Sequence, residues 1–208
     1  TSFFRDNHPF EALAHQVVPE IIKNKGPIKS IEIWSAASSM GQEPYSILMT
    51  LFDDCPQLSG WNFNLRATDI SAEALRRTKE GLYTKLEVQR GLPIKKMIKF
   101  FDKIDDNNYK FKKEYKGNLK VEKFNLFEDK IIPNSYDIIF IRNVLIYQNV
   151  ENKQKILNNI FLALRPGGYM FLGNGESLIG IEHQFKLVNF GSCTVFTKPS
   201  ESTIQKAS

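Results

Sequence analysis

The segment KSIEIWSAASSMGQEPYSILMTLFDD, residues 29–54, joins a short apolar stretch to a loop of small residues and then to a longer segment of helical character. Residues 29–36 are rich in β-branched side chains and follow Gly26-Pro27, which predicts a buried strand. Residues 42–54 predict a helix, in which Pro44 is tolerated because it lies in the first turn. This strand, loop and helix set the pattern for the rest of the chain.

Strands and helices alternate along the remaining sequence. Strands are predicted at 62–69, 135–143 and 169–174, helices at 9–25, 72–79, 93–102 and 150–164, and two closing strands within 185–198 around Gly191-Ser192. Ser71 is expected to cap one helix and Gly81 to end it, Pro19 to kink the first helix, and Pro166-Gly167-Gly168 to end the last. The alternation predicts an α/β fold whose mainly parallel sheet carries helices on both faces.

Residues 85–123 interrupt this alternation and look like an insertion. They contain twelve Lys or Arg and six Asp or Glu, a net charge of +6 in a chain whose total is +5. Within them, residues 109–124 alternate with period two around Lys116-Gly117-Asn118, which predicts a hairpin. A basic face attracts nucleic acid, a membrane surface or an acidic protein, and the alternative is a solvated Lys-rich surface.

Length and composition limit the class of protein. The 208 residues suit one α/β domain, and 42% hydrophobic residues are sufficient for a core. No apolar run approaches the roughly 20 residues of a membrane span, and the opening TSFFRDNHPF does not read as a signal peptide. Two distant cysteines and three histidines form no metal-site pattern, which predicts reduced thiols in a cytoplasmic protein without a metal. The missing initial Met leads us to expect an upstream segment.

In an open α/β sheet, ligands bind at the carboxyl ends of the strands, so residues directly after each strand are candidates. After the first strand, small residues from Ser35 to Gly41 allow a ligand close to the backbone, and Glu43 places an anion at a helix start. An anion there suits a ligand ammonium rather than a phosphate. The loop also lacks the GxGxxG pattern of a dinucleotide site.

Polar residues follow the other predicted strands as well. Asp69 could accept hydrogen bonds from ribose hydroxyls, or it could cap the next helix. Asn125 could meet an adenine edge and Leu126 its face, although Asn125 also reads as a turn residue. Arg142-Asn143 end an apolar strand, and Tyr147 lies either at the ligand edge or in the core.

Taken together, these residues resemble the CheR-type family of chemotaxis receptor methyltransferases. The resemblance spans nearly the whole chain and is carried by an ordered set of segments: residues 1–5, 33–37, 41–46, 67–71, 87–93, 124–126, 142–147, Gly173 and 176–178. It implies the class I S-adenosylmethionine methyltransferase (Rossmann-like) fold, which closes with a C-terminal β-hairpin.

The resemblance also implies an activity and a set of site residues. The expected reaction transfers a methyl group from S-adenosylmethionine to glutamate side chains of bacterial chemoreceptors, the methyl-accepting chemotaxis proteins, and leaves S-adenosylhomocysteine. The residues expected to line the cofactor site are Thr1, Arg5, Glu43, Asp69, Asn125, Leu126, Arg142 and Asn143. Arg5 and Tyr147 are expected to face the incoming glutamate as the catalytic pair.

The expected organisation follows from the same family. A catalytic domain would cover residues 1–198, with 85–123 as a small inserted β-subdomain that in some members docks a receptor's C-terminal peptide. Residues 199–208 are expected to form a disordered tail, and the family's N-terminal helical domain would precede Thr1. We expect a cytoplasmic monomer that acts on the cytoplasmic domain of a receptor, without nucleic acid and without membrane insertion.

The absence of Ser/His/Asp, Cys/His and metal constellations agrees with this chemistry. A methyl group on a sulfonium is already activated and a carboxylate is already ionised at neutral pH, so the transfer needs positioning and exclusion of water rather than a base. The chain departs from the family pattern at several positions: Ser38, Met40, Gln42, Ile141, Gln148 and Gly175. These departures are the support for a first alternative, a cofactor-binding sensor or scaffold that has lost catalysis. A second alternative, a nucleic-acid methyltransferase, rests on the basic composition.

Overall fold

A computed structural model describes residues 1–200, and its main feature is a seven-stranded sheet. In spatial order the strands are β6 (Leu119–Lys123), β2 (Asn62–Asp69), β1 (Ser30–Ala36), β7 (Tyr136–Phe140), β8 (Leu164–Phe171), β10 (Cys193–Thr197) and β9 (Lys186–Phe190). The first five are parallel to one another, and β10 runs antiparallel to both β8 and β9. The predicted parallel sheet with its closing hairpin is therefore confirmed.

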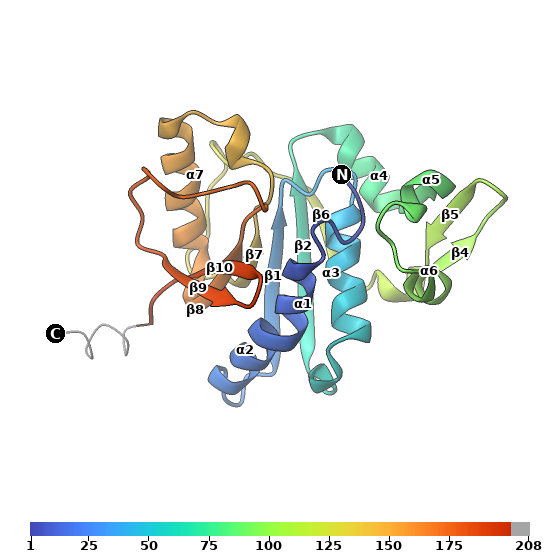
Figure 1. Ribbon diagram of the computed structural model, residues 1–208, viewed down its shortest axis with the longest axis horizontal. Helices are drawn as coiled ribbons and strands as arrows, with labels where there is room; N and C mark the ends of the chain where they lie inside the picture. Colours follow the sequence, from blue (N-terminus) through green and yellow to red (C-terminus); the bar gives the residue numbers. More distant parts are fainter. Residues whose placement is uncertain (201–208) are drawn as a thin grey trace.

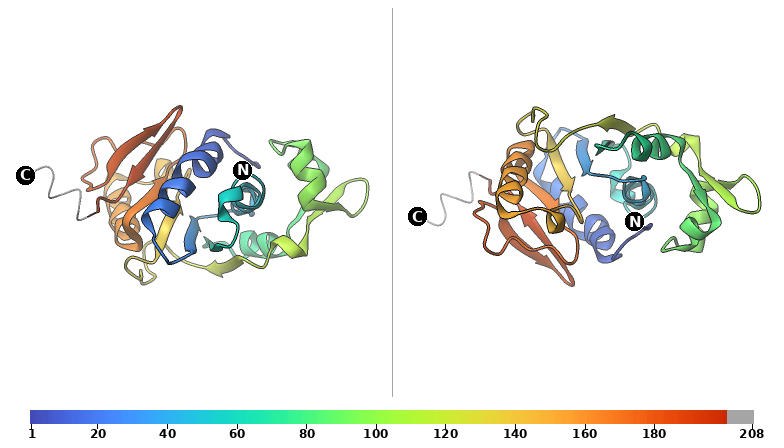
Figure 2. Two further views of the ribbon diagram at one scale, coloured as in Figure 1. Left: turned by 90° about the horizontal axis from the view of Figure 1, so that it is seen from below. Right: turned by 90° about the horizontal axis from the view of Figure 1, so that it is seen from above.

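Helices pack on both faces of this sheet (Figures 1 and 2). One face holds α1 (His8–Ala12), α2 (Val18–Asn24) and α3 (Gln42–Asp53), and the other holds α7 (Val150–Ala163). Strand β1 shows why both faces are covered, because Ile33 belongs to the first core and Trp34 to the second, each with 0% of its surface exposed. Burying side chains of this size contributes about 1.5–3 kcal/mol each.

The local signals around α3 and α4 (Ala72–Glu80) were predicted correctly. Pro44 lies in the first turn of α3, the Ser71 hydroxyl accepts a hydrogen bond from the Ala74 N–H, and Gly81 ends α4 with φ of 63°. At Pro19 the helix is not broken. A π-helical turn at Leu13–Val17 connects α1 directly to α2, whose first turn accommodates the proline.

A second, three-stranded antiparallel sheet lies beside α3 and contains β3 (Leu82–Thr84), β5 (Asn108–Phe111) and β4 (Phe101–Lys103) in that order (Figure 1). Two short helices, α5 (Lys85–Gln89) and α6 (Ile94–Phe100), belong to the same segment of chain. Aromatic rings join the small sheet to α3, since Phe111 of β5 lies 4.2 Å from Tyr45 of α3, measured between ring centroids.

The hairpin predicted for residues 109–124 is wrong. Strand β5 pairs with β3 and β4, a 3-10 turn follows at Lys113–Tyr115, and β6 then pairs in parallel with β2. Asn118 directs this exit, because its side-chain amide donates to the Phe63 carbonyl over 2.6 Å and its own carbonyl accepts from Leu65. The small sheet thus begins before residue 85 and ends before residue 119, which corrects both boundaries of the predicted insert.

Two other predictions concern the end of the chain. The strand predicted at 169–174 begins earlier, at Leu164, because α7 passes into β8 without a loop and Pro166-Gly167-Gly168 lie within the strand. The tail predicted for 199–208 falls largely outside the described residues, which end at 200. Within the described part of the chain, no helix has both the length and the apolar character needed to cross a membrane.

Candidate active site

A cavity of about 180 Å³ lies at the carboxyl ends of β1 and β7. Six of the predicted site residues line it: Thr1, Arg5, Glu43, Arg142, Asn143 and Tyr147. The rest of its lining comes from Ser2, Phe10 and the loop Ala37–Ser39. Figure 1 shows the N-terminus at the edge of the sheet toward which the β1 arrow points. The chain topology therefore brings together residues from three distant segments of the sequence.

Arg142 is the most buried charge in this cavity, with 2% of its side chain exposed. One terminal nitrogen lies 2.6 Å from an Asp6 carboxylate oxygen, and the other lies 3.4 Å from a Glu43 oxygen. The second Glu43 oxygen accepts from the Ser35 hydroxyl over 2.8 Å. The cavity floor is thus a chain of paired charges whose geometry is fixed by hydrogen bonds.

Glu43 is held in an environment that disfavours its ionised form. Burial raises its pKa above the ordinary value of 4.5, while Arg142 and the Ser35 hydroxyl oppose that shift and Glu176 adds to it. A group that approaches Glu43 with a positive charge would favour the ionised carboxylate. Perturbation by burial and a specific charge partner in a cavity is typical of a functional site.

The backbone around the cavity adopts the left-handed conformation at several residues other than glycine. In the loop after β1, φ is 58° at Ala37 and 52° at Ser39, and after β7 it is 59° at Asn143. In the N-terminal segment the same holds for Phe4 and Asp6. Such residues each cost on the order of 1–3 kcal/mol and cluster at functional sites. Strain is therefore concentrated where the three segments meet.

Gly41 ends the same loop at φ of 96° and has no room for a side chain. A Cβ there would lie 2.6 Å from the Tyr83 hydroxyl, which donates to the Met40 carbonyl over 2.8 Å. The Thr78 hydroxyl donates to the Ser39 carbonyl. The loop is therefore anchored from β3 and α4, and its position depends on the small sheet.

Asp69, Asn125 and Leu126 do not line the cavity but lie farther along the same edge of the sheet. Asp69 accepts from the backbone N–H groups of Ser39 and Ser71, at 2.8 and 2.9 Å, and its carbonyl accepts from Phe124. Asp69 therefore links the cavity loop to the start of α4, while Ser71 rather than Asp69 caps that helix. The Asn125 side-chain oxygen accepts a hydrogen bond from the Phe127 N–H, which is the contact expected of a turn residue.

The two predicted catalytic side chains are accessible. Arg5 is exposed, and Tyr147 exposes 78% of its surface while lining the cavity. The alternative in which Tyr147 is a core aromatic is therefore excluded. Its position at the cavity rim allows contact with a group that enters from solvent.

Sequence reasoning missed Asp6 and Phe10 of this site, and it did not predict that Ser35 would hold Glu43. Asp6 pairs with Arg142, Ser35 donates to Glu43, and the Phe10 ring lies 5.8 Å from the Arg142 guanidinium carbon. Ser35 lies near the carboxyl end of β1 and begins the run of small residues that the sequence had indicated. No periodicity or spacing marks Asp6 or Phe10.

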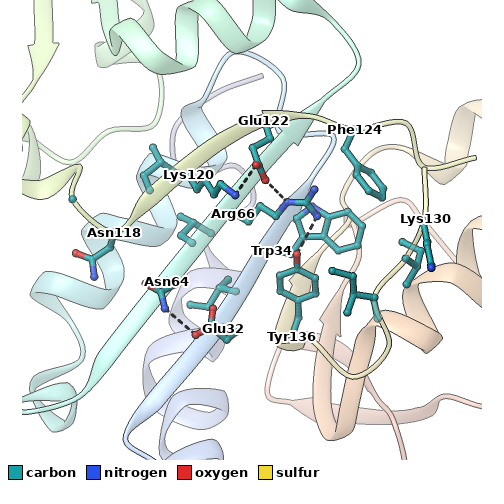
Figure 3. A pocket seen from close by; sticks show the side chains of 17 residues that line it. Glu32, Trp34, Asn64, Arg66, Asn118, Lys120, Glu122, Phe124, Lys130 and Tyr136 are labelled. Atoms are coloured by element: carbon teal, nitrogen blue, oxygen red, sulfur yellow. Dashed lines mark hydrogen bonds and ion pairs between the residues drawn. The ribbon is translucent and has the colours of Figure 1, made fainter. Parts of the chain in front are cut away.

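A larger hollow of about 750 Å³ lies elsewhere, on the sheet face opposite α3 (Figure 3). Residues 124–135, between β6 and β7, form no helix, and this leaves part of that face open. Arg66 lines this hollow, where it pairs with Glu122 at 2.8 Å, donates to the Tyr136 hydroxyl at 3.0 Å and stacks on Phe124. These polar groups satisfy one another, and none of the predicted site residues lines the hollow.

Sequence comparisons with known proteins agree on one family. The sequence model described as "CheR methyltransferase, SAM binding domain" matches residues 1–193. The chain is 43% identical over 190 residues to a chemotaxis protein methyltransferase of Vibrio parahaemolyticus, which covers 90% of this chain and 68% of that protein. It is 38% identical over 192 residues to chemotaxis protein methyltransferase Cher2 of Pseudomonas putida, with 90% and 69% covered.

Solved structures share the fold at low sequence identity. The CurJ carbon methyltransferase superposes with a TM-score of 0.55 at 14% identity, covering 91% of this chain and 54% of that one. The DszA carbon methyltransferase gives 0.51 at 15% identity, with 80% and 35% covered. Both similarities concern the fold alone.

Proposed function

The chain belongs to the CheR methyltransferase family, and we propose that it transfers the methyl group of S-adenosylmethionine to glutamate side chains of bacterial chemoreceptors. The observation that best supports this proposal is the cavity at the carboxyl ends of the strands, in a chain whose residues 1–193 match the family model. Six predicted site residues line that cavity: Thr1, Arg5, Glu43, Arg142, Asn143 and Tyr147.

The residues of this cavity fit the amino-acid end of the cofactor. Among the described residues, the Ser38 hydroxyl and the Nε of Arg142 are buried there without a hydrogen-bond partner. Buried polar atoms are normally satisfied, so both atoms are available to a ligand. Glu43 would hold the ligand ammonium, and Arg142 would offer its free N–H to an acceptor.

The adenosine part would extend beyond the cavity along the strand ends. Asp69 retains lone pairs for the ribose hydroxyls, since each of its oxygens accepts one backbone N–H. Asn125 would meet the adenine edge and Leu126, which is buried, its face. Thr1 and Asn143 would complete the binding site beside the strained loop.

The reaction itself demands little chemistry from the protein. The bound cofactor supplies a methyl group that is already activated by the sulfonium. The acceptor glutamate is ionised at neutral pH, so its oxygen attacks without a base. Arg5 and Tyr147 would orient the acceptor carboxylate at the cavity rim by charge and by a hydroxyl donor. Their task is alignment and exclusion of water.

The proposed partner is the cytoplasmic domain of a methyl-accepting chemotaxis protein, and the proposed location is the cytoplasm. The net positive charge of residues 85–123, which include two strands of the small sheet, supports docking of an acidic receptor surface. We propose a monomer that works without nucleic acid and without inserting into the membrane.

One assay tests the proposal against the two alternatives. The protein is incubated with tritiated S-adenosylmethionine and with receptor-containing membranes or nucleic acid in parallel. Label on the receptor that alkali releases as methanol supports a glutamate ester. Label on nucleic acid overturns the proposed substrate. Binding of S-adenosylhomocysteine in calorimetry without any transfer supports the sensor or scaffold instead.

A further inference from the structure

A single carboxylate gathers the backbone of the loop after β7. Glu176 accepts hydrogen bonds from five N–H groups, which belong to Asn143 (2.7 Å), Val144 (2.8 Å), Leu145 (2.7 Å), Ile146 (3.2 Å) and Gly173 (2.7 Å). Its Oε1 takes three of them and its Oε2 the other two. Glu176 lies 30 or more residues from the four loop amides in sequence, so this is a tertiary contact.

The loop depends on this carboxylate for its conformation. The backbone takes a left-handed turn at Asn143, with φ of 59°, and from there four consecutive N–H groups point at the Glu176 carboxylate. Gly173 completes the arrangement because a Cβ there would lie 2.9 Å from both the Glu176 carboxylate and the Asn143 backbone nitrogen, and 2.7 Å from the side-chain nitrogen of Asn143. A concave set of N–H groups of this kind binds an anion, and here the protein supplies its own.

The same loop carries three of the residues assigned to the site. Arg142 directly precedes the first captured amide, Asn143 supplies it, and Tyr147 directly follows the last one. We infer that Glu176 is a positioning residue for this site, whose carboxylate fixes the Asn143–Ile146 backbone and so holds Arg142 and Tyr147 at the cavity. The inference rests on the proposed function for its catalytic consequence, but the holding of the loop is testable without it.

Glu176→Gln is the decisive substitution because no orientation of the amide can replace the carboxylate. If the amide nitrogen takes the place of Oε2, it faces the N–H groups of Asn143 and Gly173. If it takes the place of Oε1, it faces three. At least two donors therefore lose their acceptor, while the size of the side chain is unchanged.

The matched control is Asp137→Asn, near the start of β7, the strand whose opposite end leads into the loop that Glu176 holds. Asp137 is a buried carboxylate that accepts the Glu32 N–H and pairs with Lys25 and Arg165. Its loss should lower the melting temperature through the sheet without touching the loop after β7. It therefore separates general destabilisation from loss of positioning.

The experiment measures hydrogen exchange, S-adenosylhomocysteine affinity by calorimetry, melting temperature and, at saturating substrates, kcat. In Glu176→Gln we expect faster exchange at residues 143–146, a dissociation constant raised about ten-fold, and kcat lowered on the order of 10²-fold, the effect of a displacement of about 1 Å. Glu176→Asp keeps the charge and both oxygens on a shorter side chain, so its values should fall between those of the parent protein and those of Glu176→Gln. It replaces Glu176→Gln in the test if that variant does not fold.

Parental exchange and affinity in a folded Glu176→Gln variant would overturn the inference. The inference would also be overturned if Asp137→Asn, at the same loss of melting temperature, changed hydrogen exchange at residues 143–146 and cofactor affinity as much as Glu176→Gln does. If the parent protein transfers no methyl group to receptors, the proposed function fails, while exchange and cofactor affinity still decide the role of Glu176.

Discussion

The guanidinium of Arg142 donates to the carboxylate of Asp6 over 2.6 Å, and the same nitrogen donates to the Arg5 carbonyl over 2.9 Å. This contact ties the N-terminal segment to the end of β7. The segment is also anchored by the Phe4 N–H, which donates to the Ser46 hydroxyl of α3, and by Phe3, whose ring packs 5.0 Å from that of Tyr83. Thr1 and Arg5 line the cavity because the contacts of Phe3, Phe4 and Asp6 hold the N-terminal segment in place.

Asp6→Asn should weaken this anchor. The substitution leaves Arg142 buried with a more distant anion, Glu43 at 3.4 Å, as its remaining charge partner. Because Arg142 is almost fully buried and Asp6 largely so, we expect the free energy of unfolding in urea to fall by about 2 kcal/mol. Asp106→Asn, which breaks a solvent-exposed pair with Lys103, is the control and should produce no measurable change. Equal stabilities of the two variants would contradict a structural role for the Arg142–Asp6 pair.

Asp69→Ala tests the proposed ribose contact. It should weaken binding of S-adenosylhomocysteine by about 1.5–3 kcal/mol, the range for hydrogen bonds to a charged group. Because Asp69 also accepts the Ser39 N–H, the loss combines a ligand contact with a loosened cavity loop. Asp69→Asn keeps one acceptor for the loop and should lose less. Calorimetry on both variants measures this, and unchanged affinity in Asp69→Ala would remove Asp69 from the site.

The fold was predictable where local signals and sheet topology agree. The strand at 62–69 was predicted with the bounds that it has, because the apolar residues Phe63, Leu65 and Ala67 alternate with polar ones and Ser71 starts the next helix. Strand order then places Glu43, Arg142 and Asn143 at one edge, so residues directly after strands could be selected without coordinates. Thr1 and Arg5 precede every strand, and only the family resemblance indicated them.

The remainder depends on contacts that no periodicity encodes. Residues 109–124 alternate in polarity as a hairpin would. In the structure their second half, β6, instead pairs in parallel with β2, which the local pattern does not indicate. Asp6 and Arg142 are 136 residues apart, and their pairing follows from the path of the N-terminal segment. Glu176 binds backbone N–H groups, which every residue except proline has, so the sequence does not indicate which of them it contacts. The segment 176–178 was noted as part of the family resemblance, but the hydrogen-bond partners of Glu176 could not be predicted.

Arg5→Ala and Tyr147→Phe test which side chains face the acceptor. If both orient the glutamate, turnover should fall more than the affinity for S-adenosylhomocysteine, because the interaction is made with the acceptor and not with the cofactor. Steady-state kinetics with receptor membranes and calorimetry supply the two quantities. Losses of equal size in turnover and affinity would instead assign these residues to the cofactor site.

Glu43 should make cofactor binding depend on pH. Burial raises the pKa of its carboxyl above the ordinary value of 4.5, and the ionised form is the one that attracts a ligand ammonium. As pH falls through that raised pKa, Glu43 takes up a proton and the affinity for S-adenosylhomocysteine should decrease, at a pH where an ordinary glutamate is still ionised. Calorimetry from about pH 8 to about pH 5 measures the slope. Glu43→Gln should bind more weakly but without this slope, and a slope that persists in that variant would assign it to another group.

The basic face of the small sheet should matter for encounter with the receptor and not for methyl transfer. Reversing the exposed Lys110 and Lys113 to Glu removes positive charge from this face. Lys112 is left unchanged because its ammonium donates to the Lys99 carbonyl over 2.8 Å at the end of α6. We expect the apparent KM for receptor to rise roughly three- to ten-fold at low salt, with kcat and cofactor affinity unaltered.

Salt dependence and a matched double reversal distinguish docking from a merely solvated face. The effect should shrink with added salt, since the Debye length falls from about 10 Å at 0.1 M to about 3 Å at 1 M. Lys29 and Lys155, exposed on the main domain, give the same change in net charge when both are reversed to Glu. That control should leave the KM for receptor near the parental value, because steering depends on where the charge lies and not only on its sum. Equal KM values for the two double variants, or kinetics of the Lys110 and Lys113 variant that ignore salt, would show that the basic face does not dock the receptor.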